Sequence, residues 1–138
     1  MKINFLAICI AFVAELFADY FCEVLMIVVL GQGALTGDAD SEANRRILDS
    51  IYHGGAFLTG KVILGTATTI GAGYLAARIA KRFPYYNGLG VGLIGLLFCI
   101  LTWGDLPWLN VFAVLSTVPM SIYGAHLAKE HMDRAGSS

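Results

Sequence analysis

The sequence predicts an all-α integral membrane protein whose four transmembrane helices form an antiparallel up-down bundle. Hydrophobic residues make up 57% of the 138 residues, and the mean hydropathy is +0.71, far above that of a typical soluble domain. The few charged residues are clustered, and between them lie apolar stretches long enough to cross a bilayer. Short connections between these stretches favour antiparallel packing of neighbouring helices.

The first expected span covers about 3–30 of a single 1–138 domain. We expect this segment to be retained, because it is longer than a signal peptide, contains acidic residues and precedes no small-residue cleavage site. The glycines that follow it end the helix. The second span covers about 51–77, and a polar helical lead-in from Glu42 precedes it.

The third span, about 88–103, begins after Pro84, which separates it from the preceding helix. Gly88 and Gly92 in this span have the four-residue spacing that lets membrane helices approach closely. A tight turn rich in tryptophan and proline then leads into the fourth span, about 108–128.

The distribution of lysine and arginine predicts the orientation of the bundle, because cytoplasmic loops of membrane proteins are enriched in both. One side of the predicted bundle holds only Arg45 and Arg46, next to several acidic residues. The other side holds Lys2, Arg78, Lys81, Arg82, Lys129 and Arg134. Both termini are therefore expected in the cytoplasm, and the compartment is expected to be a bacterial cytoplasmic (inner) membrane.

The strongest functional indication is an acidic stripe within the first span. Glu15, Asp19 and Glu23 lie four residues apart, so on a helix they share one face and cover about 12 Å of its length. Ionisable residues at bilayer depth are costly, and they usually face a protein interior or a water-filled cavity. The stripe therefore predicts a site for a proton or small cation, although three acids on one face could also serve helix pairing alone.

The second span carries the candidate counter-charge, Lys61. Counted from the outer end of each helix, Lys61 reaches the same depth as Asp19 to Glu23 on an antiparallel neighbour. We therefore expect an ion pair with Asp19 or Glu23, with either a functional or a purely structural role. His53 lies two turns before Lys61, and it is either a proton relay toward the acids or an ordinary solvated histidine.

Other site chemistries have little support in the sequence. The three cysteines fall within predicted spans and contain no C-x-x-C pair, so neither disulfides nor a metal site is expected. No catalytic signature is present, and we expect no catalytic residues and no cofactor. The net charge of −1 gives no reason to expect nucleic acid as a partner.

Two functions agree with these features. The first is proton- or cation-coupled transport or channel activity, with Glu15, Asp19, Glu23, Lys61 and His53 as the binding residues, in a homo-oligomer because four helices rarely form a complete transport path. The second is a non-catalytic accessory or assembly subunit of a larger membrane complex, in which the buried charges pair with another subunit.

Overall fold

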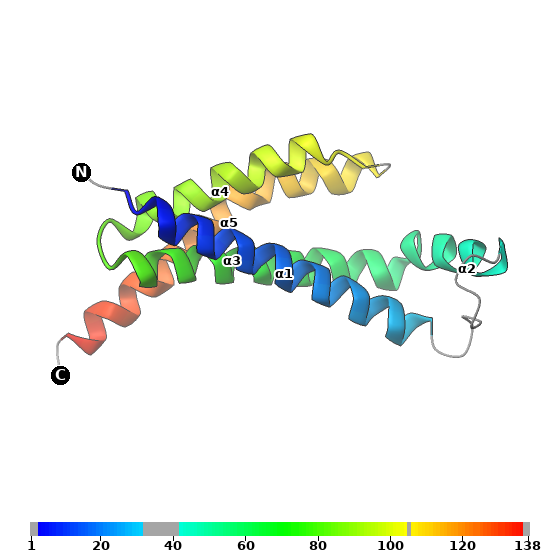
Figure 1. Ribbon diagram of the computed structural model, residues 1–138, viewed down its shortest axis with the longest axis horizontal. Helices are drawn as coiled ribbons and strands as arrows, with labels where there is room; N and C mark the ends of the chain where they lie inside the picture. The colour runs from blue at the N-terminus through cyan, green and yellow to red at the C-terminus, as the bar shows by residue number, and fades with distance from the viewer. Residues whose placement is uncertain (1–2, 32–41, 105, 137–138) are drawn as a thin grey trace.

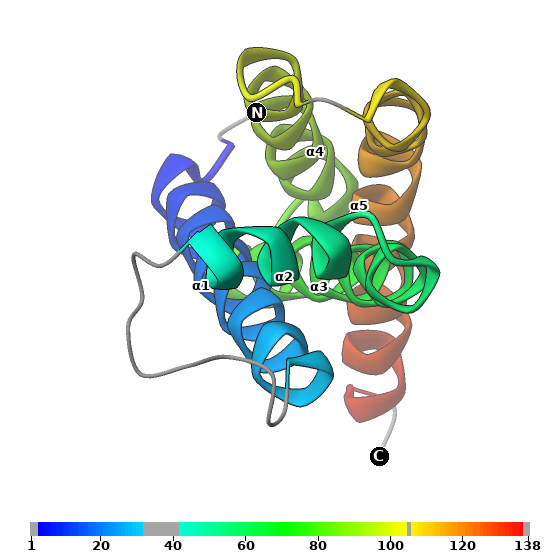
Figure 2. The ribbon, with the colours of Figure 1, turned by 90° about the vertical axis from the view of Figure 1, so that its right-hand side faces the viewer.

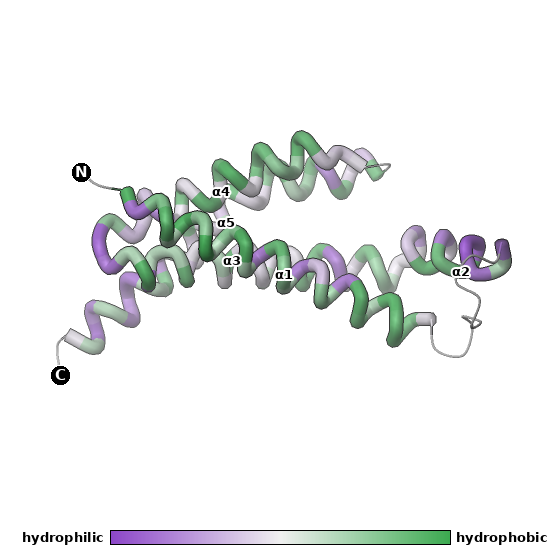
Figure 3. The backbone as a smooth tube through the Cα atoms, in the orientation of Figure 1, coloured by the Kyte–Doolittle hydropathy of each residue, from purple (hydrophilic) through white to green (hydrophobic). Residues whose placement is uncertain are grey.

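The computed structural model describes residues 3–31, 42–104 and 106–136, and this part of the chain folds into five helices. They are α1 (Phe5–Leu30), α2 (Glu42–Tyr52), α3 (Gly55–Ala80), α4 (Pro84–Leu101) and α5 (Pro107–Ala135), shown in Figure 1. All except α2 are long and apolar enough to cross a membrane, as expected for an all-α membrane protein. Figure 3 shows apolar residues along these four helices and hydrophilic residues at α2 and around the opposite end.

Helix α3 lies at the centre of the arrangement and contacts each of the other helices. Along its interface with α5, residue numbers rise together, since Ile70 meets Gly124 and Tyr74 meets His131. Figure 1 shows the start of α1, the α3–α4 turn and the end of α5 at one end of the molecule. Helix α2 lies at the other end, where it crosses from the α1 side toward α3 (Figure 2).

The second span begins later than the sequence predicts. Residues expected at its start, Ile51 and Tyr52, belong to α2, and the chain breaks at His53 and Gly54 before α3 begins at Gly55. Gly54 has an extended backbone, with φ −71° and ψ 138°. Because a residue with this backbone cannot continue a helix, the polar lead-in is a separate helix and not an extension of the span.

Glycines allow the closest helix contact in the fold, between α3 and α5. A Cβ atom added to Gly73 would lie 2.7 Å from the carbonyl carbon of Ser121, and one added to Gly124 would lie 2.8 Å from the backbone nitrogen of Tyr74. The predicted pair on α4 also faces α5, where Gly88 packs on Ala125. Small side chains thus let the helix backbones touch, as is common in membrane bundles.

The buried side chain of Asn87 joins three segments near the α3–α4 turn. Its Oδ1 accepts a hydrogen bond of 3.1 Å from the backbone N–H of Asn4, just before α1. Its Nδ2 donates to the carbonyl oxygens of Arg82 and Phe83, both at 2.9 Å. Phe83 has a left-handed backbone with φ 52°, so these bonds hold a turn that a non-glycine residue seldom adopts.

Candidate functional site

The acidic stripe of α1 faces α3, and each carboxylate has its own partner there. Thr69 donates a hydrogen bond of 2.6 Å to Oε1 of Glu15, and Thr68 donates to Oδ1 of Asp19. The Lys61 ammonium lies 3.2 Å from Oε2 of Glu23, so the predicted ion pair is present and Glu23 is the partner. Residue numbers rise along α1 as they fall along α3, in agreement with the antiparallel depth argument.

Glu15 differs from the other two acids in its burial and in its incomplete hydrogen bonding. The residue is 8% exposed, whereas Asp19 and Glu23 are intermediate. Its Oε2 atom is buried and has no hydrogen-bond partner among the described residues. Because a buried carboxylate oxygen without a donor carries a large desolvation penalty, this atom is the point at which the site is incomplete.

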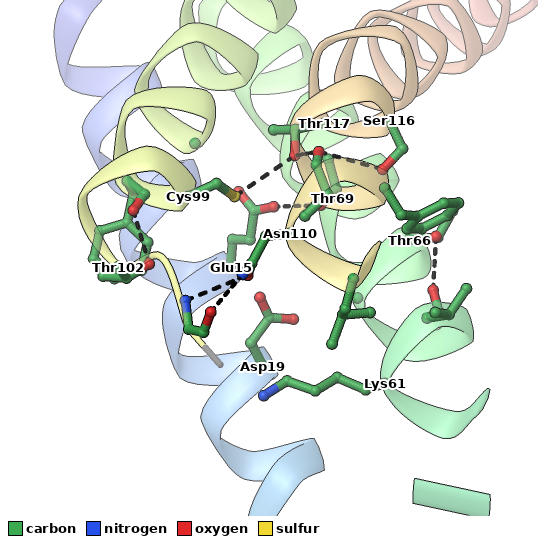
Figure 4. Close-up of a pocket in the computed structure, with 18 of the residues that line it drawn as sticks. Glu15, Asp19, Lys61, Thr66, Thr69, Cys99, Thr102, Asn110, Ser116 and Thr117 are labelled. Carbon is green, nitrogen blue, oxygen red and sulfur yellow. Dashed lines mark hydrogen bonds between the residues drawn. The ribbon is translucent and has the colours of Figure 1, made fainter. Parts of the chain in front are cut away.

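The acids open onto a cavity of about 500 Å³ lined by α1, α3, α4 and α5. Figure 4 shows Glu15 directed toward Thr69 and Cys99, with Asp19 between it and the Lys61 ammonium. Polar groups on the remaining walls come mainly from α5 and α3, namely Thr66, Asn110, Ser116 and Thr117. Much of the lining is apolar, including Phe12, Leu16, Phe98, Phe112 and Met120. The cavity therefore combines carboxylates on one wall with hydrocarbon and aromatic surface around them.

The threonines of α3 are site residues that the sequence reasoning did not identify. Thr69 follows Lys61 by eight residues and so lies on the same helix face, but the sequence pattern assigned it no role. Thr68 lies next to that face and had no assigned role. The available signal was a run of hydroxyl residues on α3 at the depth of Glu15, which offered donors to a neighbouring acid.

His53 lies at the edge of the cavity, in the break between α2 and α3. Its side chain is 56% exposed, and its Nδ1 atom lies 2.9 Å from the carbonyl oxygen of Asp49 and 3.3 Å from the Asp49 carboxylate. The ring thus contacts the last turn of α2. Its assignment as a proton relay stays a prediction, since no direct bond joins His53 to Lys61 or the acids within the described residues.

Helix α2 also contributes Tyr52 near the Glu23 end of the acidic stripe. Burial, followed by the negative charge of the nearby Glu23 carboxylate, raises the pKa of the Tyr52 hydroxyl above its ordinary value. The ring of Tyr52 packs edge-on against Phe57, with centroids 5.0 Å apart, and the Lys61 ammonium lies 5.8 Å from the Phe57 ring centre. The rings of Tyr52 and Phe57 therefore lie beside the Glu23–Lys61 pair, which stays partly exposed.

Within residues 3–31, 42–104 and 106–136, no group of three or more histidine, cysteine, aspartate or glutamate residues has a geometry that could hold a metal ion. The three cysteines are free, and Cys99 lines the cavity. Comparisons with protein-family models, with curated proteins and with solved structures find no match for this chain. The chemistry of the site therefore has to be argued from its own residues.

Proposed function

We propose that the protein is a small membrane transporter or channel in which a proton or cation binds at the carboxylates of the cavity. The observation that carries the proposal is the buried Glu15 carboxyl group, which lines the cavity and whose Oε2 atom has no hydrogen-bond partner among the described residues. An ionised carboxylate at bilayer depth is costly unless a cation compensates it. Glu15 would therefore exchange a proton for a cation as the cavity is filled.

The arrangement of the other charges supports a site that exchanges a proton or cation, rather than ion pairs that only hold two helices together. Lys61 pairs with Glu23 at the outer end of the stripe, and the hydroxyl groups of Thr69 and Thr68 are the partners of Glu15 and Asp19. A neutral hydroxyl leaves the charge of a carboxylate uncompensated, whereas a purely structural pair would use an opposite charge. Lys61 also attracts Asp19 through its charge, so Glu15 is the acid most available for a mobile proton or cation.

The proposal includes a bacterial inner-membrane location, an up-down bundle and cytoplasmic termini. Its support is the end of the molecule formed by the α3–α4 turn and the end of α5, which carries Arg78, Lys81, Arg82, Lys129 and Arg134. We further propose a homo-oligomer, because four helices rarely form a complete transport path and α1 buries only Ala7, Ile8, Ala11 and Glu15 within the chain.

Infrared titration combined with flux measurements would test the proposed function. The purified protein is titrated while the carbonyl band of protonated carboxyl groups is followed, and proton flux is measured in liposomes holding a pH-sensitive dye under an imposed potential. Glu15→Gln should remove one titrating band and reduce the flux to that of empty liposomes. Asp133→Asn, which neutralises an exposed carboxylate at the end of α5, should change neither measurement.

Two results would count against the proposal. A titrating band that survives in Glu15→Gln would show that this carboxyl group is not the exchanging one. Flux that persists in a folded Glu15→Gln protein, or flux that the unaltered protein never shows, would favour the accessory-subunit function instead.

A further inference from the structure

We propose that the cavity binds a linear aliphatic diamine, whose two ammonium groups occupy Glu15 and Asp19. This inference rests on the proposed function and names the class of cation that the site would take. It starts from the size of the cavity. A volume of about 500 Å³ lies within the range of about 300–1,000 Å³ typical of sites for organic ligands, and a bare ion or a single water fills a small part of it.

The charges of the wall select a dication. Three carboxylates line the cavity, and Lys61 forms its ion pair with Glu23. Glu15 and Asp19 accept hydrogen bonds from hydroxyl groups, with Lys61 acting on Asp19 only as a nearby charge, and the buried Oε2 atom of Glu15 has no donor among the described residues. An ammonium group has three N–H donors and a full positive charge. Each carboxylate can accept a charge-assisted hydrogen bond from one such group.

The spacing of the two acids matches a short diamine. Glu15 and Asp19 are four residues apart on one helix, a rise of about 6 Å. Standard bond lengths place the terminal nitrogens of an extended four-carbon diamine about 6 Å apart as well. The Lys61 side chain, four methylene groups ending in an ammonium group, already extends along this wall toward Asp19 (Figure 4).

The remaining lining suits the hydrocarbon part of such a ligand. Phe12 and Leu16 extend along α1 beside the acids, and Phe98 and Phe112 approach from α4 and α5. Methylene groups would lose contact with water against these side chains. A strongly hydrated metal ion would gain nothing from them, and the described residues contain no cluster of metal-binding side chains.

Calorimetry on the purified full chain in phosphatidylcholine nanodiscs would test the inference. The ligands are 1,4-diaminobutane, 1-aminobutane, 1,8-diaminooctane and calcium, with empty nanodiscs as the blank. Because a second charge-assisted bond forms, 1,4-diaminobutane should bind about tenfold or more tightly than 1-aminobutane. It should also bind more tightly than 1,8-diaminooctane, whose longer flexible chain has to fold to bring its nitrogens to the spacing of the two acids.

Variants of Asp19 connect the selectivity to the site. Asp19→Asn should bring the affinities for 1,4-diaminobutane and 1-aminobutane to within about twofold of each other. Asp19→Glu, which keeps the charge, should retain part of the preference for the diamine. Asp133→Asn, at an exposed carboxylate near the end of α5, should leave the preference for the diamine unchanged. Folding of each variant is checked by its circular dichroism and its elution in gel filtration.

Equal affinity for the monoamine and the diamine, or a preference for calcium, would overturn the inference. A preference for the diamine that persists in Asp19→Asn would also overturn the inference. These results are distinguishable from failure of the proposed function, because the infrared titration of Glu15 uses the ligand-free protein. If Glu15 titrates and 1,4-diaminobutane does not bind, only the diamine assignment falls.

Discussion

The close contact between α3 and α5 predicts opposite effects for two glycine substitutions on the same helix. Gly73 is buried, and a Cβ atom added to it would lie 2.7 Å from the carbonyl carbon of Ser121. Gly71 is exposed, and a Cβ atom added there would meet nothing within 4 Å. Gly73→Ala and Gly71→Ala therefore make the same chemical change, two residues apart, in different surroundings.

The size of each effect follows from these distances. Carbon atoms in favourable contact lie about 3.5 Å or more apart, so Gly73→Ala requires α3 and α5 to separate by at least roughly 0.8 Å. Overpacking of this kind costs about 1–3 kcal/mol, and we expect about 3 because backbone atoms cannot rotate away. Gly71→Ala should instead stabilise the protein by about 0.5–1 kcal/mol, since alanine is the better helix former.

The free energy of unfolding is measured in mixed micelles by increasing the fraction of dodecyl sulfate, with helix content as the signal. The predicted difference between the two variants is about 3–4 kcal/mol. If Gly73→Ala lowers the free energy of unfolding by less than about 1 kcal/mol, or if both variants shift it equally, the proposed backbone contact between α3 and α5 is wrong.

Two further predictions concern the Glu23–Lys61 pair and the orientation. Lys61→Met should lower the free energy of unfolding by about 1 kcal/mol, because the two side chains of the pair are only 43% and 31% exposed. The loss should be larger than that of Arg46→Met, which breaks a largely exposed ion pair with Glu42. Equal losses in the two variants would contradict the pairing of Lys61 with Glu23. Gly136→Cys should react with an impermeant maleimide only after cells are opened, whereas Gly104→Cys should react in intact cells, and the reverse pattern would refute cytoplasmic termini.

Much of the architecture could be predicted from local patterns. Long apolar runs identified the four helices that can cross a membrane, because helix length and bilayer thickness are both visible in the chain. The period of the helix placed Glu15, Asp19 and Glu23 on one face, and a depth count brought Lys61 to them. These predictions succeeded because each depends on residues within one helix or on the equal rise of two neighbouring helices.

Sequence patterns could not assign a partner to each carboxylate. A depth count could not choose between Asp19 and Glu23 for Lys61, since one helical turn separates them and the rotation of α3 about its axis decides. The same rotation presents Thr68 and Thr69 to the deeper acids. A helix period gives the relative angles of residues on one helix but not the angle at which that helix faces its neighbour.

The amino-acid sequence by itself determined that this chain forms long apolar helices carrying acids at membrane depth. The tertiary structure alone decided that Glu15 retains an oxygen without a partner among the described residues and that a cavity of about 500 Å³ opens beside it. The physical reason is that a cavity is the space left when four helices pack. Its volume depends on how closely contacts such as that of Gly73 with Ser121 bring α3 to α5, and that distance belongs to no single segment.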